Sequence, residues 1–407
     1  MRTRSRPAPR ASSRITNMSR ATRWAGQAAA AAILGVLAGC ASAPRSGPPT
    51  RNPDDAAGAA VRPERSAPSG PTVTRPAARW VGVEWSELPG WSGEWLRDWF
   101  PAFRRGCSRP APAWQGVCAA ALLDGVADLD AAAARQWLQQ RLQPFRVESL
   151  DGNADGMVTG YYEPLLEASR VRRPGYEVPI YAPPVGSRTT WTRREIDTLP
   201  PAQTGLGGRE IAWLRDRLDA LVLQIQGSGR LAITEADGSR RVVRVAFAAH
   251  NNQPYQSVGR WLIDRGELTL ARASWPGIKD WARRNPQRVD EMMWSNPRVV
   301  FFREEALPDP SVGPRGAAGV PLTPGRSIAV DPRSVPYGTP VWLDTTEPLS
   351  NNPLRRLVVA QDTGTAIVGA VRADYFWGWG DAAEASAGRM KQRLRMWVLW
   401  PLDDSPF

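Results

Sequence analysis

Two aspartates lie in the stretch QDTGTAIVGAVRADYFWGWG, residues 361–380, among glycines and other small residues. Asp374 is followed within five positions by four aromatic residues. A carboxyl group beside aromatic side chains is hard to ionise, because burial disfavours the charged form and raises the pKa. A carboxyl group that keeps its proton near neutral pH can act as a general acid. Asp374 is therefore a candidate proton donor, and the alternative is a surface acid beside core aromatics.

Asp362 follows the apolar run 357–360, so we expect a buried strand to deliver it to the edge of a sheet. There it either supports the site or binds the amides of the turn at Gly364. A third aspartate, Asp331, precedes Pro332 and is expected to cap a turn.

Other catalytic chemistries find little support in the sequence. His250 is the single histidine and has no G-x-S-x-G partner, which argues against a catalytic triad and against a histidine-rich metal site. No phosphate-binding glycine loop is present. Carboxylates therefore remain as the acid–base candidates, and no metal or cofactor is implied.

Two further stretches combine polar groups, glycine and flat aromatics in the way that is typical of carbohydrate sites. One is Thr159-Gly-Tyr-Tyr-Glu-Pro164, and the other runs from Gln224 to Arg230. We expect Gln224 and Gln226 to point to one face of a strand, where either a ligand or solvent satisfies their amides.

The elements expected to position these residues are a few helices early in the chain and many short strands later. Apolar spacing predicts helices over 91–103, 122–142 and 276–293, the last with a boundary at Pro286. Strands are expected on both sides of a turn at Asp237-Gly238 and in the runs RSIAV, TPVWL, RLVVAQ and MWVLW. Asp381 and Glu384 have the spacing of a capping box that opens a helix. The predicted fold class is α+β, mostly β.

The N-terminus has the pattern of an export signal. An apolar run at 28–39, preceded by arginines, ends at Cys40 in a sequence that resembles the bacterial lipobox, so residues 1–40 are expected to be a signal peptide with Cys40 as the lipidated residue. Translation starts at either Met1 or Met18. Residues 41–79 are rich in Pro, Ala and Arg and are expected to be a disordered tether, with order beginning at Trp80.

The net charge of +12 does not indicate nucleic-acid binding, because thirteen arginines fall in the first 80 residues. Cys107 and Cys118 form either a disulfide or two buried free thiols.

Taken in order, the segments TGYYEP, QIQGSGR, HNNQPYQSVGRWL, NPRVVFFRE, GAAGVPLTPGRSIAVDPRSVPYGTPVWL, AQDTGTAIVGAVRADYFWGWG and AGRMKQRLRMWVLWP resemble the membrane-bound lytic murein transglycosylase A family. The C-terminal section resembles the 3D domain, whose three aspartates are Asp331, Asp362 and Asp374 here. Thr365 departs from the family pattern, in which a second glycine commonly follows QDTG.

The resemblance implies a double-psi β-barrel domain formed by residues 80–164 and 304–407. It also implies a second β-barrel domain inserted at residues 165–303, with a glycan groove between the two. The implied enzyme is a peptidoglycan lytic exotransglycosylase, a carbon–oxygen lyase. It cleaves the β-1,4 bond between N-acetylmuramic acid and N-acetylglucosamine and leaves a 1,6-anhydromuramoyl end.

By the same resemblance, Asp374 is the general acid and base, and Asp362 supports it. The residues expected to bind substrate are Thr159, Tyr162, Gln226, Ser228 and Trp377. Peptidoglycan strands, outer-membrane lipid and cell-wall synthesis or remodelling enzymes are the implied partners, at the periplasmic face of the outer membrane. A noncatalytic peptidoglycan-binding lipoprotein and a peptidoglycan glycoside hydrolase are the alternatives.

Overall fold

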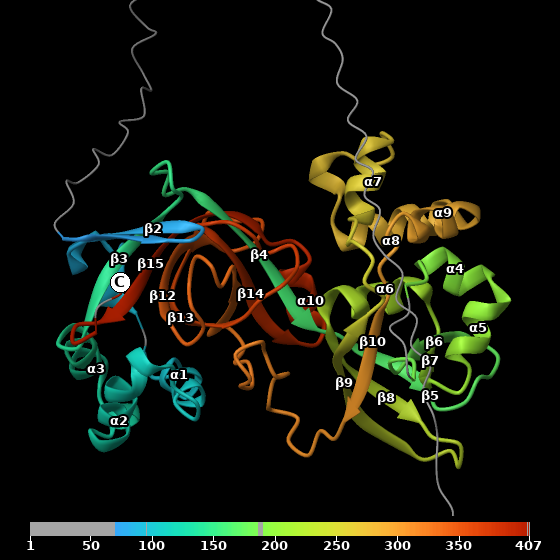
Figure 1. Ribbon diagram of the computed structural model, residues 1–407, viewed down its shortest axis with the longest axis horizontal. Helices are drawn as coiled ribbons and strands as arrows, with labels where there is room; N and C mark the ends of the chain where they lie inside the picture. The colour runs from blue at the N-terminus through green and yellow to red at the C-terminus, as the bar shows by residue number, and fades with distance from the viewer. Residues whose placement is uncertain (1–69, 95, 186–189, 405, 407) are drawn as a thin grey trace, which may run out of the picture. The chain divides into compact units, whose positions relative to one another are not determined.

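The computed structural model describes residues 70–94, 96–185, 190–404 and 406, which fold into two β-sheets with helices attached (Figure 1). Helices and strands contain roughly equal numbers of residues, so the predicted α+β class is correct. The helical share is larger than was expected for a mostly β chain. The signal peptide, Cys40 and the tether up to residue 69 lie outside the described residues. Residues predicted as the end of the tether instead form the strands that open the first sheet.

In the described part of the chain, the first sheet has nine strands in the order β1-β2-β3-β15-β12-β13-β11-β14-β4. They are β1 (Thr72–Arg75), β2 (Ala78–Gly82), β3 (Leu142–Glu148), β4 (Gly156–Glu163), β11 (Ser327–Val330), β12 (Pro340–Thr346), β13 (Pro353–Asp362), β14 (Arg372–Trp379) and β15 (Lys391–Pro401).

The first sheet closes on itself, because β15 pairs with β4 as well as with β12 and β3. The pairings thus form a ring of β15, β12, β13, β11, β14 and β4, in which β11–β13 and β14–β4 are parallel. Figure 1 shows β12, β13 and β14 curling around a common centre. Apolar side chains such as Ile328, Val358 and Val398 fill that centre and are fully buried. The ring therefore has a packed interior.

The second sheet has six strands in the described chain, in the order β10-β9-β8-β5-β7-β6. They are β5 (Leu165–Ser169), β6 (Val178–Tyr181), β7 (Glu210–Leu214), β8 (Ser228–Thr234), β9 (Arg240–His250) and β10 (Val300–Glu305). The helices of the same stretch of chain are α4 (Arg193–Thr198), α5 (Pro200–Leu206), α6 (Arg217–Gln226), α7 (Val258–Asp264), α8 (Trp275–Arg284) and α9 (Val289–Trp294), with short 3-10 helices at Leu270–Arg272 and Pro286–Arg288.

The predicted strand at Gln224 and Gln226 is wrong, because both residues lie in helix α6. Asp216 caps this helix by accepting a hydrogen bond from the Leu218 amide, and Gly227 ends it in the left-handed region at φ 77°. The strand starts only at Ser228, after the glycine. A short apolar run bounded by glycine fits a buried helix as well as a strand, and the aspartate cap decides for the helix.

The predicted helix over 122–142 is also interrupted. Helix α2 (Gln115–Leu123) ends just before Gly125, which lies in the left-handed region at φ 59°. Asp130 then caps α3 (Ala131–Gln139) by accepting hydrogen bonds from the amides of Ala132 and Ala133. The predicted helix over 91–103 is interrupted as well. A 3-10 helix spans Trp91–Gly93, a turn follows at 97–99, and α1 (Phe100–Gly106) begins only after it.

Other predicted elements are confirmed. Strands β8 and β9 flank the Gly238 turn, α8 and α9 meet at Pro286, and the four C-terminal runs are β11, β12, β13 and β15. Helix α10 (Asp381–Ala387) is where it was expected, but Gly380 is its N-cap and no side chain caps it, so the predicted capping box is wrong.

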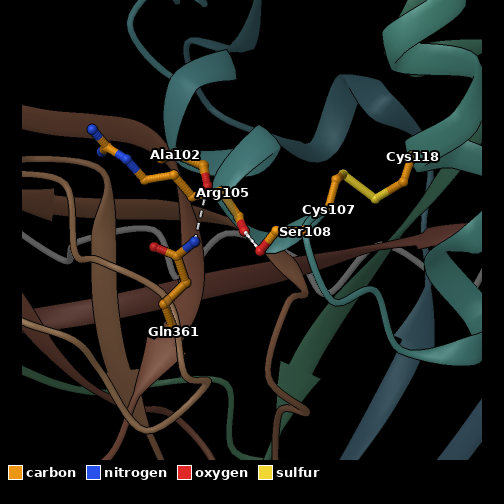
Figure 2. Close-up of a disulfide and its surroundings, with 6 residues drawn as sticks. All are labelled: Ala102, Arg105, Cys107, Ser108, Cys118 and Gln361. Atoms are coloured by element: carbon orange, nitrogen blue, oxygen red, sulfur yellow. Dashed lines mark hydrogen bonds between the residues drawn. A yellow bond between two sulfur atoms is a disulfide. The ribbon is translucent and has the colours of Figure 1, made fainter.

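Cys107 and Cys118 form a disulfide that joins the end of α1 to α2 (Figure 2), which resolves the alternative left open by the sequence. Of the helices that the structure describes, none is long and apolar enough to cross a membrane.

Candidate active site

Asp374 and Thr159 face each other on neighbouring strands of the ring. They are in register across the parallel pair β14–β4, which places their side chains on the same side of the sheet. The Thr159 hydroxyl Oγ1 donates to Asp374 Oδ1 at 2.6 Å, and Arg372 Nη2 donates to the same Oγ1 at 2.9 Å. The Thr159 hydroxyl thus links the Asp374 carboxylate to the guanidinium of Arg372, which lies on β14 like Asp374. The hydroxyl donates its proton to the carboxylate.

The surroundings of Asp374 raise its pKa from 3.8 to about 6. Burial is the main cause, and the negative charge of Asp362 adds to it, while the Thr159 hydrogen bond and the charge of Arg372 act in the opposite direction. Asp374 is still partly exposed, so a ligand can reach it. A reachable carboxyl group with a pKa close to neutral is the physical profile of a general acid.

Asp362 lies two strands away from Asp374, with Ala329 between them. Ala329 on β11 is in register with Asp374 on one side and with Asp362 on the other. Two strand spacings separate the Cα atoms of the two aspartates by about 10 Å. The residue between them is the small side chain of Ala329, which is 3% exposed.

A β-bulge sets the direction of Asp362. The β11–β13 register shifts between Ile328 and Ala329, so Gln361 is the additional residue on β13. Its buried side chain donates from Nε2 to the Ala102 carbonyl of α1 at 2.9 Å, as Figure 2 shows, and accepts from Ser327 Oγ at 2.6 Å. The bulge therefore lets Gln361 point toward α1 and places Asp362 opposite Ala329.

Tyr161 is a site residue that the sequence analysis missed. Its hydroxyl donates to Asp362 Oδ2 at 3.0 Å, and the Ala317 amide donates to Asp362 Oδ1 at 2.9 Å. Burial raises the pKa of Asp362 and, together with the nearby aspartates, the pKa of Tyr161. The signal that could have found Tyr161 is its position two residues after Thr159, which puts both side chains on one face of β4.

The turn at Gly364 supplies one of the amides that bind Asp362. The backbone partners of the carboxylate are Thr363, which precedes Gly364 in that turn, and Ala317, which the sequence did not indicate. Asp331 has the predicted structural role: it is 3% exposed and accepts from the amides of Arg333 and Gly369.

Of the residues predicted to bind substrate, Tyr162 and Gln226 contact each other, while Ser228 and Trp377 lie on separate strands. The buried side chain of Tyr162 packs with Val222 and Ala383, and its amide donates to Gln226 Oε1 at 3.0 Å, so the structure brings Tyr162 and Gln226 together. Ser228 is the half-buried first residue of β8.

Trp377 is half-buried on β14, where its Nε1 donates to Met390 Sδ at 3.3 Å. A Cβ atom added to Gly160 would lie 2.7 Å from Trp377 Nε1, so this glycine makes room for the indole.

A buried ionic cluster links β4 to the second sheet. Glu163, fully buried, accepts from Arg230 Nε on β8 at 2.8 Å and from Arg244 Nε on β9 at 2.5 Å. The Arg230 guanidinium lies 3.9 Å from the ring centroid of Trp379. Strand β4 thus carries Thr159 and Tyr161 at the candidate site. Four residues after Thr159 it also carries Glu163, which joins the first sheet to the second.

No group of three or more histidine, cysteine or acidic residues that could hold a metal ion occurs among the described residues. The chemistry that the arrangement of Asp374, Thr159 and Asp362 supports is proton transfer by a carboxyl group.

Two domain families match the chain. The MltA specific insert domain matches residues 157–303, and the 3D domain matches residues 326–400. The membrane-bound lytic murein transglycosylase A of Vibrio cholerae is 31% identical over 264 residues, which cover 63% of this chain and 68% of that protein.

Solved structures agree with these matches. The lytic transglycosylase LtgG of Burkholderia pseudomallei is 49% identical with a TM-score of 0.57, covering 82% of this chain and 98% of its own. Escherichia coli MltA with bound chitohexaose is 25% identical with a TM-score of 0.62, covering 81% and 93%. The class that these matches share is that of the lytic transglycosylases. Within it, the chain belongs to the membrane-bound lytic murein transglycosylase A family.

Proposed function

We propose that this protein, a peptidoglycan lytic transglycosylase by family membership, uses Asp374 as its single general acid and base. It cleaves the β-1,4 bond between N-acetylmuramic acid and N-acetylglucosamine and leaves a 1,6-anhydromuramoyl end. The observation that carries this proposal is the partly exposed Asp374 with a pKa of about 6. At that pKa about a tenth of the molecules hold the proton at pH 7, against fewer than about one in a thousand for an ordinary aspartate.

The reaction needs one proton, which Asp374 lends and recovers. The Asp374 carboxyl group protonates the glycosidic oxygen, the bond from that oxygen to C1 of muramic acid breaks, and its electron pair stays with the departing oxygen. The C6 hydroxyl of the same sugar then attacks C1 and passes its proton to the Asp374 carboxylate. The nucleophile is already part of the substrate, so ring closure is favoured entropically over attack by water. No second carboxylate is needed to activate a water molecule.

Asp362 supports this step as an oriented negative charge. Tyr161 and the Ala317 amide hold its two oxygens, and only the small side chain of Ala329 lies between Asp362 and Asp374 on β11. A carboxylate fixed in this way stabilises the positive charge that develops at C1 and the ring oxygen when the glycosidic bond breaks.

The glycan lies in a groove formed with the inserted domain, close to Thr159, Gln226, Ser228 and Trp377. The chitohexaose bound to the Escherichia coli relative, a hexasaccharide with the same β-1,4 linkage, supports glycan binding here. Tyr162 is 4% exposed and supports the groove from below, because it positions Gln226.

The domain plan of the proposal is a double-psi β-barrel of residues 80–164 and 304–407 with an inserted barrel domain at 165–303. The parallel pairs within the six-strand ring support the double-psi assignment. Acylated Cys40 anchors the enzyme at the periplasmic face of the outer membrane, where cell-wall synthesis or remodelling enzymes are its protein partners. The relatives described as membrane-bound support this location.

Mass spectrometry of products from purified murein tests the proposal, since an anhydro product is one water lighter than a hydrolysis product. Wild-type protein should release anhydromuropeptides, Asp374→Asn should release none, and Asp362→Asn should be slower. Asp344→Asn is the matched control, because Asp344 lies in the same ring, is partly exposed and pairs with Arg355 away from the site. Reducing-end muramic acid, or full activity of Asp374→Asn, would overturn the mechanism.

A further inference from the structure

We propose that a pocket beside Asp374 binds the acidic stem peptide carried by muramic acid. The pocket has a volume of about 550 Å³ and is lined by Gly156, Met157, Leu270, Lys391, Gln392 and Arg393. None of these residues takes part in the proposed bond cleavage. The inference rests on the proposed function, because it identifies which part of the substrate this second site receives.

The strand register places the pocket on the same face of the ring as the acid. Lys391 on β15 is in register with Thr159, which is in register with Asp374. Arg393 is likewise in register with Met157. Paired side chains on neighbouring strands lie on the same side of a sheet. Lys391 is therefore two strand spacings, about 10 Å in Cα position, from Asp374.

The charge of the pocket is positive. The side chain of Arg393 is 74% exposed and pairs with Asp155, which also accepts from Arg395. No carboxylate among the described residues pairs with Lys391, whose side chain is exposed at the pocket. The pocket lining thus holds two cations, Lys391 and Arg393, and no acid, and this surplus favours an anionic ligand. Met157 and the exposed Leu270 add an apolar wall.

The stem peptide matches this pocket in chemistry and in length. Its residues include alanines, whose methyl groups suit Met157 and Leu270, and acidic residues with free carboxylates, which suit Lys391 and Arg393. It is attached through the lactyl ether of the sugar whose C1 is attacked. An extended peptide advances about 3.3 Å per residue, so about three residues span the distance from the acid to Lys391. A peptide-free strand keeps the lactyl carboxylate and the lactyl and acetyl methyl groups, but these lie on the sugars themselves and do not extend about 10 Å to Lys391.

The test compares two substrates made from one preparation of solubilised glycan strands. One keeps its stem peptides, and the other has been stripped of them by an amidase. The measured quantity is the kcat/KM for peptide-bearing strands divided by the kcat/KM for peptide-free strands. In Lys391→Gln/Arg393→Gln this ratio should fall about three- to tenfold, the effect of removing two solvent-screened charge contacts.

Arg240→Gln is the matched control. Arg240 lies in the second sheet, its side chain is 61% exposed, and like Arg393 it pairs with one carboxylate, which for Arg240 is that of Glu167. The ratio should not change in this variant. An unchanged ratio in the double variant, or an equal fall in the control, would overturn the proposal.

A second measurement uses wild-type protein alone. Raising the salt concentration screens contacts between exposed charges. The same ratio should therefore fall as salt is added, and a ratio independent of salt would contradict a charged peptide site. Failure of the proposed function is distinguishable, because wild-type protein would then release no anhydro product from either substrate.

Discussion

Replacing Asp374 by asparagine should abolish activity and at the same time stabilise the folded protein at neutral and alkaline pH. The pKa of Asp374 is about 6 in the folded protein and 3.8 for the reference side chain. Folding therefore opposes ionisation of this group, and the opposition grows as the pH rises from about 4 to 6. Below the unfolded pKa both states hold the proton, and the group has no effect on stability.

The magnitude follows from the shift. About two pKa units correspond to about 3 kcal/mol once the pH exceeds both values. Asp374 is partly exposed, and solvent screening reduces the effect to about 1–2 kcal/mol. Asparagine has nearly the same shape and cannot ionise, so the variant should be more stable than wild type by about this amount at pH 8 and equally stable near pH 3.

Urea unfolding followed by tryptophan fluorescence measures this difference, and the chain has 19 tryptophans to report it. The two proteins should be compared at both pH values, with Asp344→Asn as the control for a generic loss of charge. An Asp374→Asn variant no more stable than wild type at pH 8 would refute the reasoning, because the carboxylate would then be ionised at no cost.

Three further outcomes follow from the same geometry. Thr159→Val removes a hydrogen bond that stabilises the charged form of Asp374, so the pKa of Asp374 should rise. The pH at which kcat/KM falls, near 6 in wild type, should then move upward by about one unit. Thr159→Ser should keep the wild-type profile, and an unshifted profile in the valine variant would contradict this role. Ala329→Leu places a large side chain between the carboxylates and should lower kcat/KM by about a hundredfold with the fold retained by circular dichroism, whereas Ala329→Ser should be mild; an active leucine variant would show that the substrate does not occupy this space. Loss of the Cys107–Cys118 disulfide, whose cysteines are 11 positions apart, should lower the unfolding free energy by about 3 kcal/mol; a reductant should have this effect on wild type and none on Cys107→Ala/Cys118→Ala.

The parts of the fold that could be predicted from the sequence are those in which the hydrophobic periodicity and the capping or turn residues indicate the same element. The C-terminal strands are short apolar runs separated by turns, and all four predicted runs are strands. Where the two signals conflict, prediction fails. The run at Gln224 has the composition of a strand, but the aspartate at 216 and the glycine at 227 cap it as a helix.

The candidate site could be predicted only in its chemistry. The aromatic neighbours of Asp374 indicate a raised pKa, and a pKa of about 6 agrees with that prediction. Thr159, 215 positions away, was placed near the site by resemblance, and its contact with Asp374 depends on strand register. Ala329 and the bulge at Gln361 also act through register, which no local pattern encodes.

The buried cluster of Glu163 with Arg230 and Arg244 limits how this enzyme can be recombined with its relatives. Exchanging the segment from β5 to β10 for that of another family member transplants the two arginines but leaves the glutamate behind. If the donor segment lacks these two arginines, the Glu163 carboxylate is left buried and unpaired, and the folded chimaera loses several kcal/mol of stability. Functional chimaeras of this family therefore require donors chosen for those two positions, or crossover points placed before β4 so that acid and arginines are inherited together.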